Sequence, residues 1–400
     1  MRQVSARENI RIDVYGKFSN GDRVKKSQWI LGLVALLALA ALAFWARSRI
    51  HFDFHVFDEQ VARADWGKIV LAVVFIAVSY LFRGARWALL MRHNKKIPLF
   101  SLIGVQVIGF TAVSLIGRVA DPVRPYLVAK KTNEPLGSQV AVYIVERLFD
   151  FGTLALFTSL ALLSIPQQGL AAVPGQAGLI SHLFAPLFHR FPILSQVFAR
   201  FGALLATLAG VLVLVVVRLS GAAVASFFEA SFGLISKNIG RAIAHKIRTF
   251  HADLDVLRSF SDFGISASLS IGMWILIGLS YAETVHAFTA SPALAPMSLP
   301  KCVLIMMISG GVSVLQLPFV GWFSQIAFVA AALSSFFGAA PEASTACAAM
   351  LLVTTSLSVI PAGLIWARFD HVSLRKVTVE SEHAEENLVA AEKTDSTVAP

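Results

Sequence analysis

Charged residues stand beside or inside apolar segments at two places in this sequence, and their types and spacing suit the binding of an anion. The first place is residues 117–126, which include Arg118, Asp121 and Arg124. Arginine binds phosphate in bidentate fashion, and a helix N-terminus also favours an anion. Because Asp121 precedes Pro122, we expect Asp121 to cap a short helix that begins there. The stretch predicts a phosphate site with Tyr126 beside it; the alternative is a cytoplasmic loop whose arginines only set the topology.

The second place is residues 145–150, which include Glu146, Arg147 and Asp150. In a helix, Glu146 and Asp150 lie four residues apart on one face, and Arg147 lies three residues before Asp150. If the helix enters a membrane at Ser138, Glu146 lies about 12 Å deep. Ionisable groups at such a depth are usually paired and often mark a pathway. These residues therefore predict either the lining of a cavity or a structural ion pair.

Arg83 and Arg86 are the candidate partners for that ion pair. Both lie in the last two turns of a predicted helix over residues 68–90. An arginine at mid-membrane costs roughly 2.5–3.5 kcal/mol on insertion scales. Because of this cost, we expect both side chains to extend toward the cytoplasmic surface.

The composition indicates that these residues belong to a membrane protein. Apolar residues make up 56% of the 400-residue chain, charged residues only 14%, and the mean hydropathy is +0.70, whereas soluble domains carry roughly 25% charge. Uncharged stretches reach the roughly 20 residues that span a bilayer as a helix. The sequence predicts an all-α polytopic membrane protein with about six full spans, over residues 29–46, 68–90, 138–165, 201–217, 263–288 and 343–367.

The net charge of +10 is best explained by topology, since cytoplasmic loops are enriched in lysine and arginine. It predicts a multi-pass protein of the bacterial inner membrane with both termini in the cytoplasm. No soluble basic domain is present for nucleic acid. Cys302 and Cys347 lie in apolar runs and are expected to be buried thiols. No metal site or cofactor is predicted.

Two further apolar segments do not fit a simple crossing. Residues 97–116 have basic clusters on both sides, and residues 302–341 begin and end on the opposite side. We expect each to form a re-entrant helical hairpin, which places one hairpin in each half of a possible inverted repeat. In the second hairpin, amide groups at a break would contact a headgroup or satisfy freed backbone groups; the residues concerned are Gln316, Pro318, Gly321 and Gln325.

Three regions follow from these expectations. Residues 1–27 form a basic cytoplasmic N-terminus, residues 28–370 the membrane domain, and residues 371–400 an acidic tail that we expect to be disordered. The sequence shows none of the common nucleophile, zinc or nucleotide motifs.

The two charged motifs resemble a known family. Residues 117–126, followed by the Val-Glu-Arg-x-x-Asp helix at 145–150, resemble the flippase-like transmembrane family related to the membrane region of lysylphosphatidylglycerol synthases. Arg118, Asp121 and Arg124 fall on that family's Arg, acidic and Arg positions, although Asp121 replaces the more usual Glu. Pro318, Gly321 and Gln325 are similar to a later Pro- and Gly-rich turn. The resemblance covers roughly residues 28–370.

The resemblance implies the handling of polar lipids. We expect translocation or binding of a membrane phospholipid or related polar lipid, with no covalent chemistry, because the chain ends soon after its last span and a large synthase domain is not expected. A membrane-embedded enzyme that modifies lipid headgroups is the first alternative. An accessory subunit of a lipid-synthesis partner is the second, with the basic residues 218–262 as its docking surface. A homo-oligomer is also compatible with the sequence.

Overall fold

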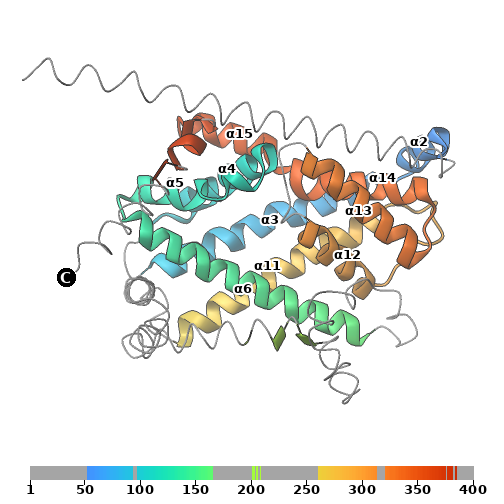
Figure 1. Ribbon diagram of the computed structural model, residues 1–400, viewed down its shortest axis with the longest axis horizontal. Helices are drawn as coiled ribbons and strands as arrows, with labels where there is room; N and C mark the ends of the chain where they lie inside the picture. The colour runs from blue at the N-terminus through green and yellow to red at the C-terminus, as the bar shows by residue number, and fades with distance from the viewer. Residues whose placement is uncertain are drawn as a thin grey trace, which may run out of the picture.

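The computed structural model describes residues 52–92, 97–164, a few positions between 201 and 208, 260–312, 320–374, and 376–384 except 382. The expected N-terminal segment, the span at 29–46 and most of the span at 201–217 lie outside these residues, as do Gln316 and Pro318. The described residues form helices without a strand, which confirms the all-α class (Figure 1).

Two long antiparallel helices run through the middle of the bundle. The first, α3 (Trp66–Met91), begins where the Asp65 carboxylate accepts hydrogen bonds from the backbone N–H groups of Gly67 and Lys68. It packs along α11 (Phe260–His286). Arg92 pairs with Asp262 at one end, and the Asp65 N–H donates to the Ala287 carbonyl at the other, at 2.8 Å. Both helices match their predicted spans to within about one turn.

A third long helix, α6 (Leu136–Leu163), lies beside α11 and runs in the same direction (Figure 1). The contacts along the two helices agree with this direction, because Phe149 stacks near Phe263, whereas residues 157–164 of α6 line one groove with residues 274–279 of α11. Within the described part of the chain, four helices are long and apolar enough to cross a membrane: Trp66–Met91, Leu99–Ile116, Ser261–His286 and Pro341–Phe369. The length of α6 would also suffice, but every 18-residue stretch of it contains the three charges at 146, 147 and 150.

The first predicted hairpin consists of α4 (Leu99–Ile116), a short 3₁₀ turn η1 (Arg118–Ala120) and α5 (Val123–Thr132). The chain reverses at Gly117, whose φ of 91° lies in the left-handed region that glycine tolerates best. Arg124 of α5 then contacts Gln106 of α4, so α5 returns along α4. The predicted cap at Asp121 is wrong: Asp121 lies in the turn after η1 with helical backbone angles, and α5 begins after Pro122 without a side-chain cap. Its carboxylate pairs with arginines instead.

The later part of the chain contains α12 (Leu299–Val312), α13 (Val320–Phe337), α14 (Pro341–Leu352) and α15 (Val359–Phe369). Gln325 donates to the Ser309 hydroxyl at 2.8 Å, so α13 returns along α12. At about 21 and 27 Å, both are shorter than the roughly 30 Å hydrocarbon core. A π-helical turn, η4 (Val353–Leu357), interrupts the last span, and such turns are frequent at functional sites. A short helix, α2 (Phe54–Ala62), precedes α3.

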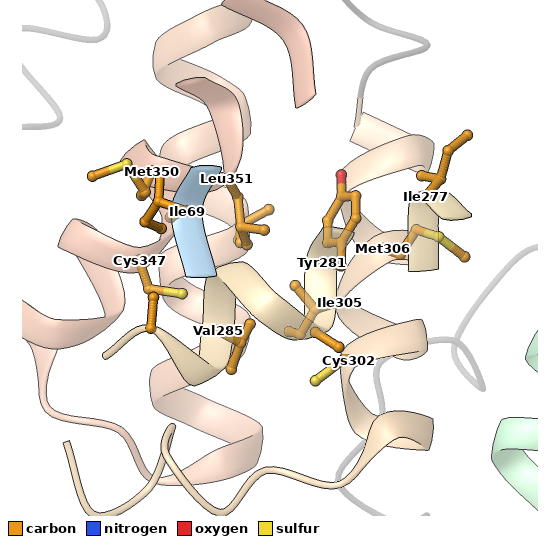
Figure 2. Packing of buried hydrophobic residues seen from close by; sticks show 14 of the residues in the cluster. Ile69, Ile277, Tyr281, Val285, Cys302, Ile305, Met306, Cys347, Met350 and Leu351 are labelled. Carbon is orange, nitrogen blue, oxygen red and sulfur yellow. The ribbon is translucent and has the colours of Figure 1, made fainter. Parts of the chain in front are cut away.

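Two clusters of buried apolar side chains pack the helices together. One core cluster joins α3 and α11 to α12, α13 and α14, and Figure 2 shows Cys302 and Cys347 among its side chains. Both cysteines are free and buried, as expected. A second cluster joins α3, α4, α5, α6 and α15. The helices of this second cluster carry the charged residues.

Residues 376–381 are helical and lie against α5. Glu380 accepts hydrogen bonds from the Tyr126 hydroxyl at 2.9 Å and from the Lys130 ammonium at 3.1 Å. Lys131 pairs with Asp370 at 2.8 Å. We call residues 370–381 the C-terminal strap. The expected boundary of the membrane domain at residue 370 stays a prediction.

Candidate functional site

The charged motifs of the sequence meet inside the bundle. Arg86 of α3, Arg124 of α5, and Glu146 and Asp150 of α6 are all buried, and Arg147 of α6 is mostly covered. Helical geometry brings them together, because Glu146 and Asp150 lie one turn apart on one face of α6. We call these residues, with Arg83, the charged cluster.

Arg86 is the centre of this cluster, and none of its side chain is exposed. Its guanidinium lies 2.7 Å from the Asp150 carboxylate and 3.0 Å from that of Glu146. It also donates to the Ser270 hydroxyl of α11 at 2.6 Å. The side chain therefore points inward, and the expectation that it extends to the surface is wrong for Arg86. Two buried carboxylates compensate for the loss of water, and the pair joins α3 to α6.

Arg124 approaches the same carboxylate from α5. Its guanidinium lies 3.2 Å from Glu146 and donates to the Gln106 side-chain oxygen of α4 at 3.3 Å. The rings of Phe110 and Tyr143 lie 4.5 and 4.8 Å from its central carbon. Such aromatic faces attract a cation.

Gly109 of α4 makes this position possible. A Cβ atom at Gly109 would lie 2.1 Å from Cγ of Arg124, which is far inside van der Waals contact. The absence of a side chain at this position lets the arginine stem cross α4 at close range. Arg124 thereby reaches the interior from a helix of only 10 residues.

Arg147 and Arg83 complete the cluster. Arg147 pairs with Glu146 and lies 2.9 Å from Asp150, and its side chain is 22% exposed. Arg83 lies over the ring of Phe110, with 4.4 Å from its central carbon to the ring centre, and near the ring of Tyr80. Phe110 therefore contacts guanidinium groups from both α3 and α5.

The cluster carries more positive than negative charge. Three guanidiniums, at positions 86, 124 and 147, pair with two carboxylates, at positions 146 and 150, and a fourth, at position 83, lies over an aromatic ring. The excess is two positive charges in a largely buried place. Among the described residues, the Nε atoms of Arg86, Arg124 and Arg147 are buried and have no hydrogen-bond partner. Within the same described residues, Glu146 Oε2 and Asp150 Oδ2 are also buried without a hydrogen bond, so it is the excess positive charge, and not the count of open donors, that favours an additional group carrying negative charge.

The structure separates Arg118 and Tyr126 from this interior. Arg118 lies at the tip of the hairpin with its side chain 34% exposed, and it pairs with Asp121 at 3.4 Å. Asp121 also lies 4.0 Å from Arg124, so it connects the tip to the cluster. Tyr126 faces the C-terminal strap. Of the first motif, only Arg124 enters the buried site.

The beginning of α13 contacts the end of α4. The Trp322 indole N–H donates to the Ser114 carbonyl, near the end of α4, at 2.9 Å. Gly321 precedes Trp322 at the beginning of α13, and Gln325 is buried and donates to Ser309. Gln325 therefore joins the two helices of its own hairpin rather than entering the charged cluster.

Sequence reasoning missed several residues of the site. Gln106, Ser270 and Trp274 all bind charged members of the cluster. Gln106 is the only amide side chain in the apolar run at 97–116, a signal that could have indicated a buried polar contact. Ser270 and Trp274 are ordinary residues in spans, and only tertiary packing shows their contacts.

The arrangement of charges is suited to binding an anion. Both carboxylates are bound by arginines, and no nucleophile contacts them within the described part of the chain. The described residues also contain no group of three potential metal ligands.

Comparison with known proteins gives one match. A family model described as the lysylphosphatidylglycerol synthase TM region matches residues 29–363. No curated protein and no solved structure matches the chain.

Proposed function

Because the chain belongs to the family of the lysylphosphatidylglycerol synthase transmembrane region, we propose that it binds polar membrane lipids and moves their headgroups across the bilayer. The family supports a lipid-related role in a membrane. The observation that carries the proposal is the excess of two positive charges in the charged cluster.

A lipid phosphate is the acceptor that fits this cluster. Guanidinium groups bind phosphate through parallel N–H donors, and a phosphodiester brings the negative charge that the cluster lacks. Arg124 is the main contact in this proposal, since it reaches the cluster from the hairpin. Arg86 is held by two carboxylates and a hydroxyl, so it mainly positions Glu146 and Asp150.

The two hairpins form the route in this proposal. We propose that α4 with α5, and α12 with α13, are re-entrant elements that enter from opposite faces, alongside about six full spans. Three features support it: each hairpin reverses direction, α5 and α12 are too short to cross, and the beginning of α13 contacts the end of α4 through Trp322 and Ser114. Both termini then lie in the cytoplasm of a bacterial cell.

We propose further that the chain performs no covalent chemistry itself. The alternative of a headgroup-modifying enzyme needs a base and a nucleophile within reach. Glu146 and Asp150 could serve as bases only after release from their arginines. Mass spectrometry of lipid recovered from vesicles containing the purified protein separates the two, because an enzyme changes the mass of the lipid. An accessory role predicts a partner that co-purifies and a chain that is inactive alone.

The main test compares Arg124→Gln with Arg118→Gln in proteoliposomes. The vesicles contain phosphatidylcholine, phosphatidylglycerol and a trace of phosphatidylglycerol with a fluorescent headgroup, whose exposure is followed by an impermeant reductant. We expect Arg124→Gln to abolish headgroup movement, Arg124→Lys to retain part of it, and Arg118→Gln to behave like the unmodified chain. Folding is checked by the protection of the buried thiols of Cys302 and Cys347. Equal transport by a folded Arg124→Gln variant removes the assigned site.

A further inference from the structure

An apolar groove lies between α6, α11 and α12, next to the charged cluster. Its volume is about 220 Å³. A cavity of about 150 Å³ lined by aliphatic and aromatic side chains is enough to hold benzene. The lining residues are almost all apolar: Phe157, Leu160, Ala161 and Ser164 from α6, Trp274, Ile275, Gly278 and Leu279 from α11, and Leu299, Pro300 and Val303 from α12. The three helices contact one another, as Figure 1 shows.

Trp274 connects this groove to the charged cluster. Its side chain lines the groove, while its indole N–H donates to the Asp150 carboxylate at 3.3 Å. One turn earlier on α11, Ser270 binds Arg86. A tryptophan suits such a boundary because its body is apolar and its N–H is polar.

The groove extends away from the charges along both helices. On α6 it begins at Phe157, seven residues beyond Asp150, which corresponds to about 10 Å along the helix axis. Its outer edge is open, since Leu160, Ile275 and Leu299 are about half exposed, at 51%, 47% and 50%. A molecule in the groove would therefore have one end beside the charges and one side toward the surrounding acyl chains.

Gly278 keeps the groove open. This residue is buried, yet a Cβ atom added to it would meet nothing within 4 Å. The space in front of Gly278 is thus not filled by other side chains. A larger residue at this position would enter the groove without displacing the backbone of a neighbouring helix.

We infer that this groove holds one acyl chain of the lipid whose phosphate lies at the charged cluster. The inference rests on the proposed function, and it specifies the substrate class as a phosphate-bearing lipid with an acyl chain. Three observations support the acyl chain as occupant: the apolar lining, the exposed apolar residues at the open edge, and the continuity with the charged cluster through Trp274. Trp274 is then the residue at which the polar and apolar parts of the site join.

The test uses the full-length chain in phosphatidylcholine vesicles. A trace of phosphatidylglycerol carries a photoactivatable diazirine in one acyl chain, and the labelled peptides are mapped by mass spectrometry after irradiation. We expect residues 157–164 and 274–279 to be labelled more strongly than the exposed side of α3, which carries Val70, Leu71 and Val74. Equal labelling of the groove and of α3 would mean annular lipid contact only and would overturn the inference.

Two variants that fill the groove provide the critical comparison. Gly278→Leu fills it from α11, and Leu160→Trp fills it from α6. The matched control is Gly264→Leu, because Gly264 also has open space around it but lies on α11 outside the groove. We expect either filling variant to lose the excess label in the groove and the control to retain it. Unchanged labelling in a folded filling variant contradicts the inference.

A second probe separates this inference from the proposed function. Diacylglycerol with the same diazirine chain lacks the phosphate. If the phosphate holds the lipid at the charged cluster, diacylglycerol labels the groove less than the phospholipid does, and Arg124→Gln reduces the phospholipid label. Equal labelling by both probes would leave the groove as a chain site but refute its link to the phosphate. If the groove is labelled no more than the exposed side of α3, but transport still depends on Arg124, the acyl-chain site is refuted while the proposed function stands.

Discussion

Replacing Arg86 tests whether the charged cluster holds the bundle together. Arg86 is fully buried and contacts two carboxylates, at 2.7 and 3.0 Å, and one hydroxyl, at 2.6 Å. Removing one partner of a buried ion pair costs about 3–5 kcal/mol because the other charge stays buried. Arg86→Met keeps most of the apolar volume of the side chain. We expect it to lower the free energy of unfolding by about that amount.

The charge balance of the cluster predicts which second change compensates. Arg86→Met lowers the excess from two positive charges to one, Asp150→Asn raises it to three, and the double variant restores two. Glu146 keeps Arg124 and Arg147 as partners in the double variant. We expect the double variant to cost less than the sum of the two single variants, with a coupling energy of about 0.5–3 kcal/mol.

The free energy of unfolding is measured by titration of the purified protein with a denaturing detergent. The readout is the reaction of Cys302 and Cys347 with a thiol-specific dye, since both cysteines are buried and free. The control is Arg63→Ala, which removes an exposed pair with Glu59 at 2.7 Å and should change the stability by less than about 1 kcal/mol. The reasoning fails if Arg86→Met resembles this control, or if the costs of the single variants simply add.

Two further predictions concern α5. Gly109→Ala should displace Arg124, cost about 1–3 kcal/mol of stability and slow headgroup movement, whereas Gly264→Ala, with open space around it, should change neither the detergent titration nor the vesicle assay. Glu380 of the C-terminal strap has a pKa below its ordinary value, chiefly because it accepts a hydrogen bond from Lys130. A lowered carboxyl pKa stabilises the strap above the ordinary value of 4.5, and this contribution is lost as the pH falls through the lower folded pKa. Amide exchange of residues 376–381, corrected for the intrinsic pH effect, should therefore rise in acid; in Glu380→Gln it should be high already at neutral pH, and an unchanged variant would contradict the assignment.

The sequence predicted much of the helical framework because apolar length and charge are local properties. The spans at 68–90 and 263–288 correspond to α3 and α11, and the reversal near Gly117 is present. The role of the Asp121 side chain, in contrast, could not be predicted from local sequence. Two arginines lie within reach of its carboxylate, and their positions depend on the fold.

The candidate site was predicted only in part. The spacing of Glu146 and Asp150 correctly placed both on one face of α6, and Arg86 is the partner of both. The position of Arg124 depends on close packing against Gly109, and that of Trp274 depends on the side-by-side arrangement of α6 and α11. Neither contact leaves a periodic signal in the sequence, so sequence reasoning could not distinguish the buried Arg124 from the partly exposed Arg118.

The two carboxylates have a distinct task in the proposed function. Four clustered arginines alone would bind a phosphate tightly but would repel one another and would have no carboxylate partners after its release. Glu146 and Asp150 hold Arg86, Arg124 and Arg147 in place when no lipid is present. They also reduce the excess charge to two, so that one phosphodiester leaves the cluster still positive by one. A carrier must bind its lipid well enough to draw the headgroup inward and weakly enough to let it leave. The ratio of four arginines to two carboxylates satisfies both conditions, because the carboxylates replace the phosphate as acceptors each time the lipid departs.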